Sequence, residues 1–255
     1  MLNYLLLKKF RMQNYKIIID ENILKKFINE ILPDNEDNEQ FYLCLLARNK
    51  WNKQIQLKEK QIQLKRFTST KERIIEKLRQ LECVIGSYKS HDIDIPNELL
   101  GVYIMPNPRD LKKAQLNLLK EIANNVINNN FNDNPQSIAL NEIQKSCSRK
   151  LYYDIDIDID KIIIDDKSII LQEILKIIKQ NFSFDNEMNN KDIIIIDTHG
   201  GYHILLNVNK GHKNWYQSIK NIKFNGLISI QMNGDNLVPL PGCVQGNRTP
   251  FIINF

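Results

Sequence analysis

The sequence predicts an α+β protein in which a helical N-terminal module packs on a C-terminal module of mixed or antiparallel sheet. Apolar residues recur at helical spacing in the N-terminal half, and short apolar runs of strand length occur in both halves. The pattern changes after an Asn- and Asp-rich connector at residues 128–136. We therefore expect an N-terminal module over residues 1–140 and a sheet module over residues 141–255, which together form one core.

The N-terminal module should alternate between helices and strands. Proline ends both the first helical pattern and the second strand pattern, and the spacing of Ser69 and Glu72 is that of a capping box at the start of a helix. We expect helices at residues 21–31, 69–81 and 110–127, and strands at residues 41–48 and 99–105.

The second module should contain βαβ-type packing. Strand patterns at residues 150–158, 192–197 and 202–208 surround a helix pattern at residues 168–180. Residues 227–255 have the pattern of further strands joined by Gly and Pro turns.

Composition excludes several classes of protein. The chain has 255 residues, 42% of them hydrophobic and 25% charged, which excludes a disordered chain or a collagen. No stretch approaches the ~20 apolar residues of a membrane span, and the four cysteines lack the close pairs of a zinc site. The net charge of +5 is compatible with a phosphate-rich partner. We expect an intracellular protein with free thiols and no membrane partner.

A run of alternating aspartates is the first candidate site. Residues 151–160 read Leu-Tyr-Tyr-Asp-Ile-Asp-Ile-Asp-Ile-Asp, and on a strand one face carries Asp154, Asp156, Asp158 and Asp160. Carboxylates on one face repel one another, and a divalent cation such as Mg²⁺ or Mn²⁺ removes that penalty. The alternative is an exposed sheet face in a chain rich in Ile and Asp. The same Asp-x-Asp spacing recurs at Asp92 and Asp94, where we expect a loop.

A glycine turn is the second candidate, and a loop near the C-terminus is the third. Residues 198–201 read Thr-His-Gly-Gly, and the next strand carries His203. Adjacent glycines let backbone amides approach phosphate oxygens, although a plain hairpin turn explains the same letters. The third segment has Asp235 in a turn, a Leu-Pro-Gly corner at residues 240–242, and Arg248, which could hold a phosphate through two hydrogen bonds. A connecting loop explains this segment equally well.

Taken in this order, the three segments resemble the motifs of the archaeo-eukaryotic primase superfamily, in particular primase-polymerase proteins of viruses and plasmids. Motif I of that family, three apolar residues followed by Asp-x-Asp, is matched by residues 151–156. Motif II, a small-residue turn ending in His, is matched by residues 198–203. Motif III, an acid followed by a strand and often a Pro-Gly turn, is matched by Asp235 and residues 240–242.

The resemblance implies an RRM-like catalytic sheet and template-dependent nucleotidyl transfer on single-stranded DNA, as a primase or DNA polymerase using NTPs or dNTPs with Mg²⁺ or Mn²⁺. It assigns catalysis and metal binding to Asp154, Asp156 and Asp235. The Asp run leaves Asp156 and Asp158 as an alternative pair. The incoming nucleotide is assigned to Thr198, Gly200, Gly201, His203 and Arg248. The template is assigned to Arg48, Lys50 and Arg109. A replicative helicase or an accessory priming factor is an implied partner.

Two other functions remain open at this point. One is a catalytically silent, primase-like subunit that binds nucleic acid within a larger complex. The other is a rolling-circle initiator nuclease, which requires a His-apolar-His motif. Three residues separate His199 from His203, so the spacing disfavours the nuclease.

Overall fold

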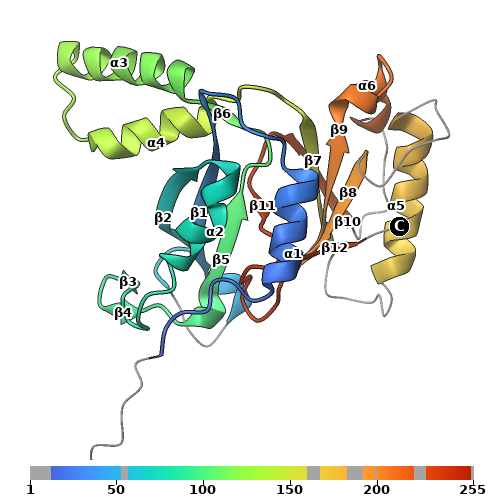
Figure 1. Ribbon diagram of the computed structural model, residues 1–255, viewed down its shortest axis with the longest axis horizontal. Coiled ribbons are helices and arrows are strands. Elements are labelled where there is room, and N and C mark those ends of the chain that lie inside the picture. The colour runs from blue at the N-terminus through green and yellow to red at the C-terminus, as the bar shows by residue number, and fades with distance from the viewer. Residues whose placement is uncertain are drawn as a thin grey trace, which may run out of the picture.

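The computed structural model is an α+β fold built on two antiparallel five-stranded sheets, as the sequence predicts at the level of fold class (Figure 1). It describes residues 13–52, 57–159, 167–182, 192–198, 200–220 and 228–253. Helices lie between the sheets and on their outer sides (Figure 1).

The first sheet has the strand order β11-β5-β1-β2, with the short strand β6 also paired to β1. Its strands are β1 (Glu39–Arg48), β2 (Gln61–Ser69), β5 (Leu100–Ile104), β6 (Arg109–Asp110) and β11 (Val238–Pro239). The central strand β1 is apolar and buried on both faces. Leu43 and Leu45 contact the core between the sheets, whereas Tyr42 and Cys44 pack against Met105 and the neighbouring helical hairpin.

The second sheet has the order β10-β7-β9-β8-β12. Its strands are β7 (Tyr152–Ile159), β8 (Ile193–Asp197), β9 (Gly201–Asn207), β10 (Ile228–Gly234) and β12 (Phe251–Ile253). Helix α5 (Lys167–Phe182) connects β7 to β8, and helix α6 (Trp215–Lys220) lies between β9 and β10 in the chain. Because β7 and β8 both run antiparallel to β9, they are parallel to each other, and α5 is the expected βαβ crossover with β9 inserted between its strands.

Successive side chains of β7 and β9 point to opposite sides of the second sheet, so its two faces contact different parts of the fold. Ile155, Ile157 and Ile204 pack against α5, whereas Leu205 on the other face joins the core shared with the first sheet. Helix α1 (Glu21–Lys26) continues as a π-helical turn over Phe27–Ile31 and fills the space between the sheets (Figure 1). The aspartate face of β7 is therefore the face turned toward the first sheet.

The remaining helices lie around the first sheet. Helix α2 (Ile74–Arg79) follows a 3-10 turn, and helices α3 (Leu111–Ile127) and α4 (Pro135–Lys145) form a hairpin that projects from the fold (Figure 1). A two-stranded ribbon, β3 (Lys89–Ser90) and β4 (Ile93–Asp94), replaces the loop expected around the second Asp-x-Asp. None of the described helices has both the length and the apolar character needed to cross a membrane.

Several expectations differ from the structure. The N-terminal module is not simply helical, because it supplies four strands to the first sheet, including the unexpected β2. Ser69 is no helix cap, since it ends β2 opposite Phe41, and no side chain in the described part of the chain caps the following helix. Helix α4 begins inside the expected connector, with Asn134 as its N-cap, and residue 140 lies within it. Strand β11, from the C-terminal part of the chain, belongs to the first sheet.

Candidate active site

Three carboxylates line one face of β7, as the alternation predicts. Asp154 is buried, Asp156 is partly exposed and Asp158 is exposed, so the row runs from the interior to the surface. Asp160 lies outside the described residues. The deeper pair, Asp154 and Asp156, therefore occupies the enclosed part of this face, where interactions between charges are strongest.

His203 joins the deeper pair from the neighbouring strand. It lies directly opposite Asp156 in the β7–β9 register and is 8% exposed. Its Nδ1 lies 3.0 Å from Asp154 Oδ1, and its Nε2 lies 3.5 Å from Asp156 Oδ1. Burial opposes protonation of the imidazole, but the negative charges of Asp154, Asp156 and Asp158 outweigh it and raise the pKa of His203. The ring thus bridges two carboxylates and balances part of their charge.

The pair still carries uncompensated negative charge. Asp154 Oδ2 is buried and accepts no hydrogen bond from the described residues. Burial raises the pKa of Asp156, with the like charges of Asp158 and Asp154 adding to the effect and the positive charges of His203 and Lys50 opposing it. An unpartnered carboxylate oxygen beside a carboxyl group with a raised pKa is the electrostatic situation that a bound cation relieves.

Asp235 lies beside this group but is bonded to Arg109. Gly234, with φ of +75°, pairs with Asp154 at the end of β10, and Asp235 follows it. Arg109 is fully buried and donates to both carboxylate oxygens of Asp235, through Nη1 at 2.8 Å and Nη2 at 2.5 Å. Burial alone would raise the pKa of Asp235, but these hydrogen bonds and the charge of Arg109, with help from Asn107, lower it. Arg109, expected to contact the template, lies instead in the interior.

Asn107 ties these segments together. Its Oδ1 accepts hydrogen bonds from the amides of Leu151 and Tyr152 at 2.9 and 2.8 Å. Its Nδ2 donates to Asp235 Oδ1 and to the carbonyl of Tyr152 at 3.0 and 2.9 Å. This fully buried side chain fixes the start of β7 relative to both Asp235 and the loop after β5. Asn107 was not identified from the sequence as a site residue. Its position between Pro106 and Pro108 was the one local feature that could have drawn attention to it.

The glycine turn is tightly built. Thr198 donates from both its amide and its hydroxyl to the carbonyl of Gly201, each at 3.0 Å. The carbonyl of Gly200 accepts from the Ile159 amide at 3.0 Å. A Cβ on Gly201 would lie 1.8 Å from the Ile157 carbonyl oxygen, so only glycine allows β9 to approach β7 at this position. His199 lies outside the described residues.

The predicted basic residues occupy different places. Lys50 is exposed at the end of β1, and its charge acts on Asp156 across the space between the sheets. Arg48 donates to the Tyr103 hydroxyl at 2.9 Å and lies 5.8 Å from the centres of the Trp51 and Tyr103 rings. Arg248 is exposed in the turn after β11, where its backbone pairs with Gln245.

The structure therefore brings Asp154, Asp156 and His203 into direct contact and places Asp235 next to them. In the part of the chain that the structure describes, no group of three or more His, Cys, Asp or Glu side chains is arranged to hold a metal ion. The described cysteines are free thiols. No family model, curated protein or solved structure matches the chain.

Proposed function

We propose that the face of β7 and β9 carries out template-dependent nucleotidyl transfer on single-stranded DNA with a divalent cation, as a primase, a DNA polymerase or both. The observation that carries the proposal is the cluster of Asp154, Asp156 and His203, in which a buried carboxylate oxygen has no donor among the described residues. A purely structural histidine–carboxylate contact would be expected to satisfy its buried oxygens.

The donor set fits Mg²⁺ or Mn²⁺. Both are hard cations that bind carboxylate oxygens, and Mg²⁺ is commonly held by one or two carboxylates together with substrate phosphates. Two carboxylates, Asp154 and Asp156, are therefore sufficient protein ligands when a triphosphate supplies the rest. When bound, the cation lowers the pKa of an attacking 3′-hydroxyl and neutralises charge on the leaving pyrophosphate.

The remaining residues have roles that follow from their positions. His203 balances part of the carboxylate charge, and its imidazole could donate a hydrogen bond to a triphosphate oxygen. The amides around Gly200 and Gly201, with Thr198 bracing the turn, lie at the exposed end of the same face. Lys50, in the turn that follows β1, would contact the phosphates of a template, together with the nearby Arg48. Arg109 positions Asp235, and Arg248 is a further phosphate ligand.

The topology of the second sheet supports the same proposal. From β7 to β10 the chain runs β-α-β-β-α-β, and the fourth, first, third and second strands lie side by side. That arrangement is the split βαβ pattern of RRM-like sheets, on which the primase-polymerase resemblance places its catalytic aspartates. A helicase or priming factor as partner belongs to the same proposal.

Nucleotide incorporation on single-stranded DNA tests the function. The purified protein receives labelled NTPs or dNTPs with Mg²⁺ or Mn²⁺, with and without an annealed primer. We expect products that an Asp154→Ala/Asp156→Ala variant does not make. Asp92→Asn/Asp94→Asn is the matched control, because it alters the same spacing in the β3–β4 ribbon. Products from the Asp154/Asp156 variant equal to those from the native protein would overturn the assignment.

A catalytically silent nucleic-acid-binding subunit is the second candidate. One observation favours it: Arg109 and Asn107 already bond to the carboxylate of Asp235, which is the third acid of the resemblance. This candidate predicts intact binding of single-stranded DNA with no product under any condition of the assay. The Asp158→Asn variant tests the alternative metal pair in the same experiment, because Asp156 belongs to both pairs and Asp158 only to the alternative one.

A further inference from the structure

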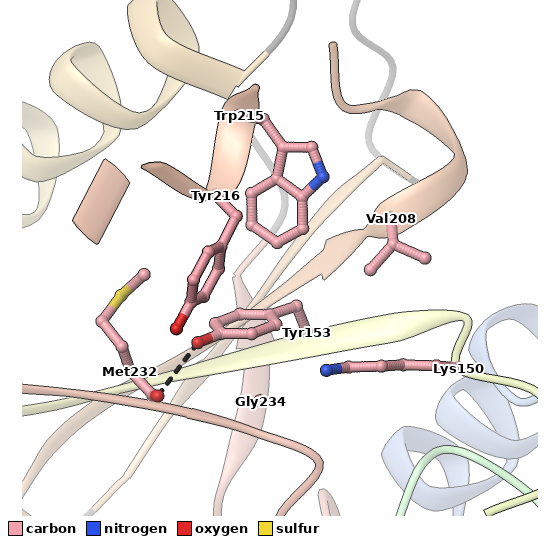
Figure 2. Close-up of a pocket in the computed structure, with 7 residues that line it drawn as sticks. All are labelled: Lys150, Tyr153, Val208, Trp215, Tyr216, Met232 and Gly234. Atoms are coloured by element: carbon pink, nitrogen blue, oxygen red, sulfur yellow. Dashed lines mark hydrogen bonds between the residues drawn. The ribbon is translucent and has the colours of Figure 1, made fainter. Parts of the chain in front are cut away.

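A second concave site lies on the other face of the second sheet. A pocket of about 480 Å³ is lined by seven residues, Lys150, Tyr153, Val208, Trp215, Tyr216, Met232 and Gly234 (Figure 2). Tyr153 alternates with Asp154 along β7, so the pocket and the carboxylates lie on opposite sides of the same strand. The volume is within the range of small-molecule sites, which is about 300–1,000 Å³.

Three aromatic rings form the wall of this pocket. The Tyr153 ring makes edge-to-face contacts with Trp215 at 5.2 Å and with Tyr216 at 5.6 Å between ring centres. The Tyr153 hydroxyl donates to the Met232 carbonyl at 2.9 Å, which fixes the ring at the base of the pocket (Figure 2). Trp215 also packs against Phe182 of α5, whereas Tyr216 remains 37% exposed. Helix α6 therefore holds the Trp215 ring against α5 and leaves the Tyr216 ring partly exposed to solvent.

Two lysine ammonium groups lie over the rings. Lys150 Nζ lies 4.9 Å from the centre of the Tyr153 ring, and Lys220 Nζ lies 5.8 Å from that of Tyr216. None of the seven lining residues carries a carboxylate. Aromatic cages often bind organic cations, but a cation here would meet two ammonium groups that already lie over the rings. The pocket instead suits a flat aromatic ligand that carries negative charge.

We propose that this pocket binds one nucleotide, with its base stacked on Tyr216 and its phosphate held by Lys150. Aromatic side chains beside basic groups are the usual platform for unpaired bases, and stacking does not require a particular base. The site is separate from the carboxylate cluster and does not depend on the proposed catalysis. The nucleotide is either free or part of a single strand, and these two sources share the chemistry.

Photocrosslinking tests the site directly. An oligothymidylate of about eight nucleotides with a central 5-iodouracil is irradiated with the protein, and the modified peptide is identified by mass spectrometry. Thymidine monophosphate, followed by nuclear magnetic resonance, provides the free-nucleotide arm. We expect crosslinks at Trp215 or Tyr216, and at least about fivefold weaker oligonucleotide binding in Tyr216→Ala and in Lys150→Gln. Changes in the chemical shifts of pocket residues on adding thymidine monophosphate, if Tyr216→Ala abolishes them, identify a free nucleotide as the ligand. Crosslinks at the pocket without such changes identify a single strand.

Matched variants separate this site from general effects. Phe131→Ala and Lys120→Gln remove an exposed ring and an exposed charge from the region of the α3–α4 hairpin, and both should bind as the native protein does. Asp154→Asn should keep the crosslink, so failure of the catalytic proposal would not remove it. Lys150 is exposed, and its variant is expected to fold even if Tyr216→Ala does not. Crosslinks confined to other segments together with no binding of thymidine monophosphate at the pocket would overturn the proposal, as would binding of both probes that Lys150→Gln leaves unchanged.

Discussion

Replacing Arg109 with methionine should lower the free energy of unfolding by about 3 kcal/mol. Removing one partner of a buried ion pair costs about 3–5 kcal/mol, because the other charge remains buried without compensation. Arg109 is fully buried, but the Asp235 side chain is 22% exposed, so water can partly solvate the orphaned carboxylate and the lower value applies. The substitution also leaves the carbonyls of Gln144 and Asn107 without their donor.

Urea unfolding of four proteins measures this effect. The native protein, Arg109→Met, Asp235→Leu and the double variant form a cycle, and the double variant should be more stable than the sum of the single losses predicts. The midpoint temperature of thermal unfolding should fall by about 6–12 °C in Arg109→Met. Lys120→Met, on the exposed side of α3, is the control and should change stability by less than about 0.5 kcal/mol. Additive losses, or a loss below about 1 kcal/mol in Arg109→Met, would refute the description of Arg109 as the buried counterion of Asp235.

Three further changes test other parts of the structure. Asn107→Ala leaves two partly buried amides at the start of β7 without their acceptor, and we expect a loss of about 2–3 kcal/mol in the free energy of unfolding in urea; an unchanged stability would contradict the role of Asn107 in fixing β7. Gly201→Ala forces a methyl group into the Ile157 carbonyl and should cost about 3 kcal/mol or more, so a thermal midpoint within about 2 °C of native would be inconsistent with the register. Arg149 helps to lower the pKa of buried Glu39, against the effect of burial, so this pair stabilises the fold above the ordinary glutamate pKa and the contribution fades as pH falls through the lowered one. The stability difference between native protein and Glu39→Gln should therefore shrink on acidification, and a difference that stays constant from neutral pH to about pH 3 would contradict this.

Local sequence patterns predicted the elements whose packing follows from their own periodicity. Strands β1, β7 and β9 are strongly apolar or alternate in polarity, and the alternation placed Asp154, Asp156 and Asp158 on one face. Strand β2 was missed because its exposed positions are polar, as is common for a strand at the edge of a sheet. Helix α4 was missed because Asn-rich sequence precedes it and the local signal for a connector was stronger than its capping signal.

The site depends on contacts that no local pattern contains. Arg109 and Asp235 are 126 residues apart, and neither position indicates that the arginine is buried as the counterion of the acid. The same holds for the aromatic pocket, whose Tyr153 and Trp215 come from separate segments and meet only through the sheet register and α6. Charged and aromatic residues can be recognised in a sequence. Which charged side chains pair with one another is decided by the tertiary structure.

Binding of Mn²⁺ in the presence of a nucleoside triphosphate tests the central claim most directly. Electron paramagnetic resonance measures free Mn²⁺. In a titration with Mn²⁺, the free-Mn²⁺ signal of native protein plus nucleotide should be lower than that of the nucleotide alone. Asp154→Asn/Asp156→Asn should abolish this difference, because it removes the two carboxylates that face His203. Asp92→Asn/Asp94→Asn should bind as the native protein does. Equal Mn²⁺ binding by the native protein and the Asp154/Asp156 variant would contradict the assignment of this face as the cation site.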